Sequence, residues 1–235
     1  MGIEEILNSF KEHLLTSDIK DKVVKIILFG SHAKGTSTIN SDIDILIVTT
    51  NGKDVDKSLM DRVYEYMIEY NAPLEVITSN IDDLFLLQDF FIYNITRYGM
   101  EVYSMEKEEI KKMMLKDLVR LSEEYLESAK EVLNMNRIRL AIDAGYNAAE
   151  LAAKALIFLK ENDLPGSHGG VVSLFGQLYI KTKEVTPEIG RNLNLSLKLR
   201  NEARYKPNAL LRKEDAKNTL KLAESLIKIV SKKDI

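Results

Sequence analysis

Apolar residues in the first hundred positions alternate between two kinds of spacing. Spacings of three and four residues predict amphipathic helices over residues 2–15 and 53–70. Short runs rich in β-branched residues, bounded by glycine, proline or asparagine, predict strands. The predicted strands cover residues 23–29, 43–49, 74–78 and 101–103. A further helix is expected to begin near Ile81. Together these elements predict an α+β domain with a small mixed sheet.

From Glu106 onward the apolar pattern has only the helical period. It predicts five helices, over residues 106–134, 138–162, 169–182, 187–204 and 213–231. In the second of them alanines and a glycine recur at spacings of three and four, which predicts a flat stripe for close packing of another helix. The change of pattern places a domain boundary near Ser104. We therefore expect an α+β domain over residues 1–104 and an all-α helical bundle over residues 105–235.

The composition narrows the possible chemistry. The 235-residue chain has no cysteine, which excludes disulfides, thiolate metal sites and thiol nucleophiles. Only three histidines remain, so a metal ion would be a hard cation held by carboxylates, Mg²⁺ or Mn²⁺. No apolar run approaches the roughly 20 residues that a membrane-spanning helix needs. A cytoplasmic protein without a membrane partner is expected.

Charge is distributed unevenly between the two predicted domains. Residues 1–104 contain 17 Asp and Glu against 9 Lys and Arg, whereas residues 105–235 contain 19 against 24. The net charge of the whole chain is −3, and no stripe of basic residues stands out in the sequence. A nucleic-acid backbone is therefore not expected as a partner.

Two aspartates open the second predicted strand. Asp42 and Asp44 are two residues apart, so in a strand their side chains point the same way. Two such carboxylates repel each other, and nothing on this strand offers a compensating base. The pair becomes favourable when divalent cations neutralise both groups, and two cations can clamp the attacking and leaving oxygens of a phosphoryl displacement. The pattern therefore predicts that Asp42 and Asp44 bind two Mg²⁺ ions, with Mn²⁺ as the other possible metal.

The turn after the first predicted strand offers groups for binding a phosphate. Gly30 lets the backbone approach an anion closely, and Ser31 can donate its hydroxyl and open a short helix that faces the anion. Lys34, together with His32, can offset triphosphate charge; the alternative is that both are ordinary loop residues. Ser41, next to the aspartates, is a further candidate for nucleotide binding.

A third acid is expected on the strand beside the two aspartates. Glu75 is the only acid inside the apolar run over residues 74–78. It could complete the metal site and accept the proton of an acceptor hydroxyl, which would make it a catalytic residue with Asp42 and Asp44. The alternative is an exposed charge on an edge strand.

The combination of Gly30-Ser31, Asp42-x-Asp44 and a later strand acid resembles the minimal nucleotidyltransferase branch of the DNA polymerase β superfamily, over roughly residues 20–104. The resemblance implies the mixed-sheet nucleotidyltransferase fold. It also implies transfer of a nucleoside monophosphate from an NTP, with ATP as the expected donor, to a hydroxyl of a protein or small molecule. Two features differ from the family pattern: the loop reads GSHAKG where GSRARG-like forms are common, and the third acid is Glu where Asp is frequent.

Residues 106–235 resemble HEPN helical domains, which often accompany minimal nucleotidyltransferases. The matching pieces are residues 141–150, 167–170 and 200–205. HEPN ribonucleases carry Arg-x4–6-His on the later helix, and here Tyr205 stands where the histidine is expected after Arg200. Because HEPN bundles often pair, the resemblance also implies a homodimer.

Four residues of the bundle are candidates for a groove that contacts the acceptor: Asp143, Glu150, Arg200 and Tyr205. The alternatives are a solvated stripe for the two acids and an interhelical polar network for the other two. Two other functions stay open. A regulatory protein of the toxin–antitoxin type would bind nucleotide without turnover, and a HEPN ribonuclease would need a general base other than the missing histidine.

Overall fold

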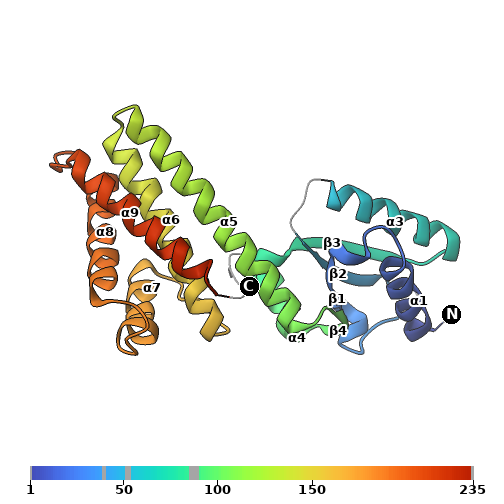
Figure 1. Ribbon diagram of the computed structural model, residues 1–235. Coiled ribbons are helices and arrows are strands. Elements are labelled where there is room, and N and C mark those ends of the chain that lie inside the picture. The colour runs from blue at the N-terminus through green and yellow to red at the C-terminus, as the bar shows by residue number, and fades with distance from the viewer. Residues whose placement is uncertain (1, 39–40, 51–53, 85–89, 234–235) are drawn as a thin grey trace. The chain divides into compact units, whose positions relative to one another are not determined.

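The computed structural model describes residues 2–38, 41–50, 54–84 and 90–233 (Figure 1). The chain divides into two compact units, Met1–Lys111 and Lys112–Ile235. The units part inside helix α5 (Lys107–Asn134), a few residues beyond the domain boundary expected near Ser104. The boundary that we infer from the sequence stays a prediction.

A four-stranded sheet forms the centre of the first unit. Its strands are β1 (Val23–Leu28), β2 (Ile43–Thr49), β3 (Leu74–Asn80) and β4 (Met100–Ser104). Their order across the sheet is β3-β2-β1-β4. The β2–β3 pair is parallel, whereas β1 pairs with β2 and with β4 in antiparallel fashion. The predicted mixed sheet is therefore confirmed, and β3, which carries Glu75, lies at one edge.

Four α-helices of the first unit alternate with its strands along the described part of the chain. They are α1 (Ile3–Leu15), α2 (Gly30–Ala33), α3 (Val55–Tyr70) and α4 (Phe90–Tyr98). The helix expected near Ile81 begins as a 3-10 turn, η2 (Ile81–Leu84), and its continuation lies outside the described residues. Helix α4 was not predicted as a separate element.

One face of the sheet packs on α1 and α3. Every second residue of β2, namely Ile43, Ile45 and Ile47, joins the buried cluster that includes Phe10 of α1 and Tyr66 of α3. The phenol of Tyr66 donates to the backbone oxygen of Ile6 at 3.0 Å and thereby satisfies its polar atom. Since strand side chains alternate between faces, the intervening residue Asp44 lies on the opposite face.

The second unit is a bundle of helices, as the sequence predicts (Figure 1). After α5 come α6 (Ile138–Lys160), α7 (His168–Phe175), α8 (Pro187–Tyr205) and α9 (Lys213–Val230). A π-helical turn, η3 (Gly176–Ile180), continues α7, so the helix expected over residues 169–182 changes its hydrogen-bond pattern halfway. The predicted all-α class of this half is confirmed.

The stripe of small residues on α6 packs against α9. A Cβ atom added to Gly145 would lie 2.9 Å from Cδ1 of Leu220 and 3.2 Å from Cγ2 of Thr219, both on α9. Ala141 and Ala148 on the same stripe are fully buried. Because glycine and alanine leave the backbone accessible, the two helices approach closely, as the spacing in the sequence predicts.

Two phenols are buried inside the bundle. The hydroxyl of Tyr179 donates to the backbone oxygen of Leu156 at 2.5 Å, and burial raises the pKa of Tyr179 to about 12. Burial, and secondly the nearby carboxylate of Glu150, raise the pKa of Tyr146 above its ordinary value. In both cases the environment favours the neutral phenol.

Alkaline pH is expected to unfold the bundle. The folded-state pKa of Tyr179, about 12, lies above the ordinary value of 10.0. The stability that the neutral phenol contributes is therefore complete below pH 10 and is lost as the pH rises through 12. Between pH 10 and 12 we expect the phenolate absorbance near 295 nm to increase while the helical circular dichroism signal decreases. Full ionisation of all phenols in a protein that keeps its native circular dichroism would contradict this prediction.

Within the described residues, no helix combines the length and the apolar composition that crossing a bilayer requires.

Candidate active site

The carboxylates of Asp44 and Glu75 belong to neighbouring positions of the sheet. In the parallel pairing of β2 with β3, Asp44 is the register partner of Glu75. Register partners on adjacent strands point to the same face, so both acids lie on the face opposite to the core of α1 and α3. Asp44 is half-buried and Glu75 is exposed. The third acid thus lies beside the aspartate, on the adjacent strand where the sequence places it.

Asp42 lies just before the first residue of β2 and is exposed. The backbone between the two aspartates is fixed, because the N–H of Ile43 donates to the oxygen of Pro73 at 2.8 Å and Ile43 itself is buried. Asp42 therefore lies at the N-terminal end of β2, two residues before Asp44.

Gly30 makes close contact with Asp44. Its φ angle is +66°, in the left-handed region that favours glycine. A Cβ atom at this position would lie 2.6 Å from the carboxyl carbon of Asp44 and would overlap one of its oxygens. The N–H of Phe29 also donates to the backbone oxygen of Asp44 at 2.9 Å. The Gly-Ser turn and the second aspartate are therefore adjacent in the folded chain.

The other residues expected at the phosphate side surround the same turn. Ser31 is half-buried in α2, and Lys34, which follows this helix, is exposed. The hydroxyl of Ser41 accepts a hydrogen bond from the N–H of Thr38 at 2.9 Å, and the His32 ring lies 3.3 Å from the backbone oxygen of Ser41. Ser41 thus contacts both Thr38 and His32 near the turn, whereas the side chain of Lys34 is exposed to solvent.

The site offers carboxylates rather than a preformed metal cage. Among the described residues, no three acidic or imidazole groups gather closely enough to hold a metal ion. Mg²⁺ is commonly bound by one or two carboxylates together with phosphate oxygens of the substrate. The oxygen donors of Asp42 and Asp44 fit that mode of binding, with the triphosphate as the source of further ligands.

An apolar cavity beside Gly30 was not foreseen from the sequence. It has a volume of about 510 Å³, and its walls include Phe29 and Gly30 on one side and Phe91 and Tyr98 of α4 on the other. The signal that could have revealed it is the density of aromatic residues over 90–98, which is high for a chain with 7% aromatic residues. Without knowledge of α4, these residues could not be assigned to the site.

In the second unit, the predicted groove residues fall into two separate polar clusters, one around Asp143 and one around Glu150. Asp143 accepts two hydrogen bonds from Arg204, at 2.7 and 3.1 Å, and lies 3.4 Å from Nε of Arg200. Arg200 is buried, with its guanidinium 6.0 Å from the ring of the exposed Tyr205. These contacts join α6 to α8, so the interhelical network that we considered for Arg200 is present.

Glu150 pairs with a residue that the sequence places in a loop. Both of its carboxylate oxygens lie 2.8 Å from Nδ1 of His168, the first residue of α7. Glu150 is only 5% exposed, so the interpretation of this residue as part of a solvated stripe is wrong. No helix pattern could reveal this pairing, because the partner residues are 18 positions apart on different helices.

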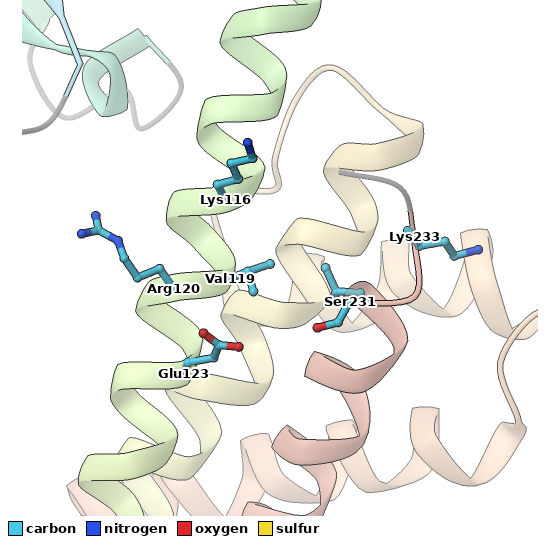
Figure 2. A pocket seen from close by; sticks show the side chains of 7 residues that line it. Lys116, Val119, Arg120, Glu123, Ser231 and Lys233 are labelled. Atoms are coloured by element: carbon cyan, nitrogen blue, oxygen red, sulfur yellow. The ribbon is translucent and has the colours of Figure 1, made fainter. Parts of the chain in front are cut away.

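A small cavity of about 260 Å³ opens between α5 and the residues after α9 (Figure 2). Lys116, Arg120 and Lys233 contribute cations, and Glu123 contributes a carboxylate. Arg120 binds Asp117 at 3.0 Å, and Lys233 lies 3.7 Å from Glu184, outside the cavity. Because two of its four charged side chains pair with residues outside the cavity, we do not assign a catalytic role to it.

Two family models match the chain: the nucleotidyltransferase domain over residues 3–120 and the HEPN domain over residues 115–233. A Methanocaldococcus jannaschii protein named "Putative protein adenylyltransferase MJ0141" is 30% identical over 102 residues, 43% of this chain and 100% of that protein. A protein of the same organism with the same description, MJ0604, is 37% identical over 85 residues, covering 36% of this chain and 75% of its own. A third, "Putative toxin MJ0142", is 29% identical over 109 residues, covering 46% and 74%. The chain therefore belongs to the nucleotidyltransferase-domain family through its N-terminal half and to the HEPN-domain family through its C-terminal half.

Proposed function

We propose that the protein transfers AMP from ATP to a hydroxyl group of a protein acceptor and releases pyrophosphate. One observation carries this proposal: the Asp44 carboxylate lies against the backbone of Gly30 and beside Glu75 in the parallel register. This arrangement puts a turn suited to phosphate next to two acids on one face of the sheet. The names of the relatives MJ0141 and MJ0604 support adenylyl as the transferred group and protein as the acceptor class. A small-molecule hydroxyl is the other acceptor class that the site permits.

Each residue has a distinct task in the proposed reaction. The backbone of Gly30 and the hydroxyl of Ser31 hold the β- and γ-phosphates, and Lys34 offsets their charge. Asp42 and Asp44 would hold two Mg²⁺ ions, or Mn²⁺, which when bound neutralise charge on the phosphate oxygens.

The chemical step is an in-line displacement at the α-phosphorus. The acceptor oxygen forms a bond to this phosphorus while the bond to the oxygen bridging toward the β-phosphate breaks. The bonding electrons leave with pyrophosphate, and the proton of the acceptor hydroxyl passes to the carboxylate of Glu75. The exposure of Glu75 is compatible with this role, because the acceptor must reach it from solvent.

The proposal is tested with ATP labelled at either the α- or the γ-phosphate. The purified protein is incubated with Mg²⁺ and a cell extract, and products are separated by gel electrophoresis. We expect label from the α-phosphate in a protein band and no label from the γ-phosphate, with transfer abolished by EDTA. Modification of the protein itself would appear in the same gel. ATP binding without pyrophosphate release under any of these conditions would instead indicate a regulatory nucleotide-binding protein of the toxin–antitoxin type.

The ribonuclease alternative is less well supported by the bundle. The only histidine in the second unit, His168, is bound to the buried Glu150. At the position where HEPN ribonucleases carry a histidine after the motif arginine, Arg200, this chain has the exposed Tyr205. Cleavage of RNA in EDTA that is lost on Arg200→Ala and retained in Asp42→Asn would favour this alternative.

A further inference from the structure

The nucleotide of the proposed reaction leaves the cavity beside Gly30 uncovered. In that reaction Gly30, Ser31 and Lys34 hold the β- and γ-phosphates, so the nucleoside, at the other end of the triphosphate, lies away from this turn. The cavity extends from Gly30 and Lys34 to α4 and has a volume of about 510 Å³. Cavities of this size bind small organic molecules. The cavity is therefore open to a ligand other than the nucleotide.

Most of the cavity wall is aromatic or aliphatic. The rings of Phe29 and Phe91 meet edge to face, with centroids 5.9 Å apart, and Ile95 and Tyr98 of α4 also line the cavity. Phe91 is 51% exposed and Tyr98 is 74% exposed. Covering these rings with an apolar ligand is favourable, because it removes their surface from water. A flat aromatic ring system therefore matches the walls in shape and polarity.

The charge around the cavity favours an anionic ligand. Among the described residues that line it, Lys34 is the only one with a charged side chain. Its ammonium makes no hydrogen bond or ion pair within the described part of the chain. A second cation, the guanidinium of Arg97, lies 6.0 Å from the centroid of the Tyr98 ring. The carboxylate of Asp44, which contacts Gly30, would be neutralised by a bound divalent ion in the proposed reaction.

We propose that this cavity binds an aromatic carboxylate, with its ring system against Phe91 and Tyr98 and its carboxylate at Lys34. The aromatic walls select the flat apolar body of the ligand, and the unpaired ammonium selects its single negative charge.

One consequence of this binding site rests on the nucleotidyltransferase function proposed above. In that function Lys34 offsets the charge of the triphosphate, so a carboxylate bound to the same ammonium competes with ATP. The cavity is then a site at which a small aromatic anion inhibits adenylyl transfer. The binding of the anion itself does not depend on the proposed function.

The aromatic walls are tested with anilinonaphthalene sulfonate, a dye whose fluorescence increases in apolar sites and whose sulfonate stands for the carboxylate. We expect saturable binding of one dye molecule per chain. Tyr98→Ala is expected to weaken this binding roughly tenfold, because one wall of the site is lost, whereas Tyr98→Phe retains the ring and the affinity. Tyr64→Ala removes a similarly exposed aromatic side chain from α3 and is the matched control, which leaves the dissociation constant unchanged.

The role of the charge is tested by displacing the dye with naphthoate or with naphthalene methanol, which has the same ring system and no charge. Lys34→Met is expected to weaken naphthoate binding about fivefold and to change naphthalene methanol binding less than about twofold. The effect on naphthoate should disappear at about 1 M salt, where charges more than about 3 Å apart are screened. Lys57→Met removes an exposed cation from α3 and is the control that leaves naphthoate binding unchanged.

Two results would overturn the assignment of the cavity. Equal dye binding in the wild type, Phe91→Ala and Tyr98→Ala would place the dye elsewhere on the protein. Naphthoate binding that is unchanged in Lys34→Met at low salt would show that the site does not select an anion.

Competition with inorganic tripolyphosphate separates this inference from the proposed function. At constant ionic strength, tripolyphosphate is expected to displace naphthoate, and naphthoate is expected to raise the KM for ATP while kcat stays unchanged. If naphthoate binds as expected and tripolyphosphate does not displace it, the cavity site stands and the role of Lys34 in the proposed function is wrong.

Discussion

Replacing Asp44 by asparagine is expected to abolish adenylyl transfer, with kcat lowered by roughly 10³-fold or more. The substitution keeps the shape of the side chain, so the close contact with Gly30 is preserved. It removes the negative charge through which the half-buried carboxylate would hold divalent cations against the triphosphate. The effect is measured as the rate of α-phosphate label incorporation at saturating ATP and Mg²⁺.

A matched control distinguishes the role of this charge from a general effect of net charge. Asp61→Asn removes one exposed carboxylate from α3, in the same unit, and is expected to leave kcat within about twofold of the wild type. If Asp44→Asn retained wild-type transfer, the Gly-Ser turn and the aspartate would be adjacent for structural reasons alone. The proposed function would then be wrong.

Gly30→Ala is expected to remove activity to a similar extent by a different route. The new Cβ would overlap the Asp44 carboxylate and force either the turn or the aspartate to move. The left-handed φ of +66° adds backbone strain for any residue with a Cβ, and such a residue costs about 1–3 kcal/mol of stability. Both the free energy of unfolding, from urea titration, and the rate of label transfer should fall.

The glycine five residues later separates these two contributions. Gly35 has almost the same φ, +68°, but a Cβ added there meets nothing within 4 Å. Gly35→Ala should therefore lose about 1–2 kcal/mol of stability from the same backbone strain and keep its activity. Equal loss of activity in the two variants would indicate that turn conformation, rather than the contact with Asp44, matters for catalysis.

The elements of the fold were predictable wherever the apolar spacing was long and regular. The period in the second half gave helices whose ends agree with α6 and α9 to within two residues. The β-branched runs likewise identified β1 and β2. The local sequence pattern is sufficient to predict these helices and strands, because each of them buries one continuous face.

Helix α4 and its cavity depend on contacts that no local pattern contains. Its nine residues, Phe90–Tyr98, are too short for a reliable helical period, and they follow a segment that the sequence assigns to a helix from Ile81. The aromatic residues of α4 line this cavity only because the fold brings Phe29 and Phe91 together, with ring centroids 5.9 Å apart. The sequence therefore leads to the carboxylates as candidates, whereas it gives no indication of the cavity beside Gly30.

The pairing of Glu150 with His168 was hidden for a related reason. The acid occupies a polar position of α6 in a pattern that suits a solvated helix surface. Its burial becomes tolerable only when the imidazole at the start of α7 supplies a hydrogen-bonding partner. Neither the sequence of α6 nor that of α7 alone predicts that a histidine on one helix offsets the cost of burying an acid on the other.

The parallel register of β2 and β3 links correct folding to the assembly of the candidate site. Leu74 and Val76 flank Glu75 and pack in the same apolar cluster as Ile43 and Ile45. If β3 slipped by one position, both apolar side chains would turn to the solvent and Glu75 would enter the hydrocarbon interior. Misaligned molecules would therefore be too unstable to persist, and a population that is folded at all carries its carboxylates correctly aligned.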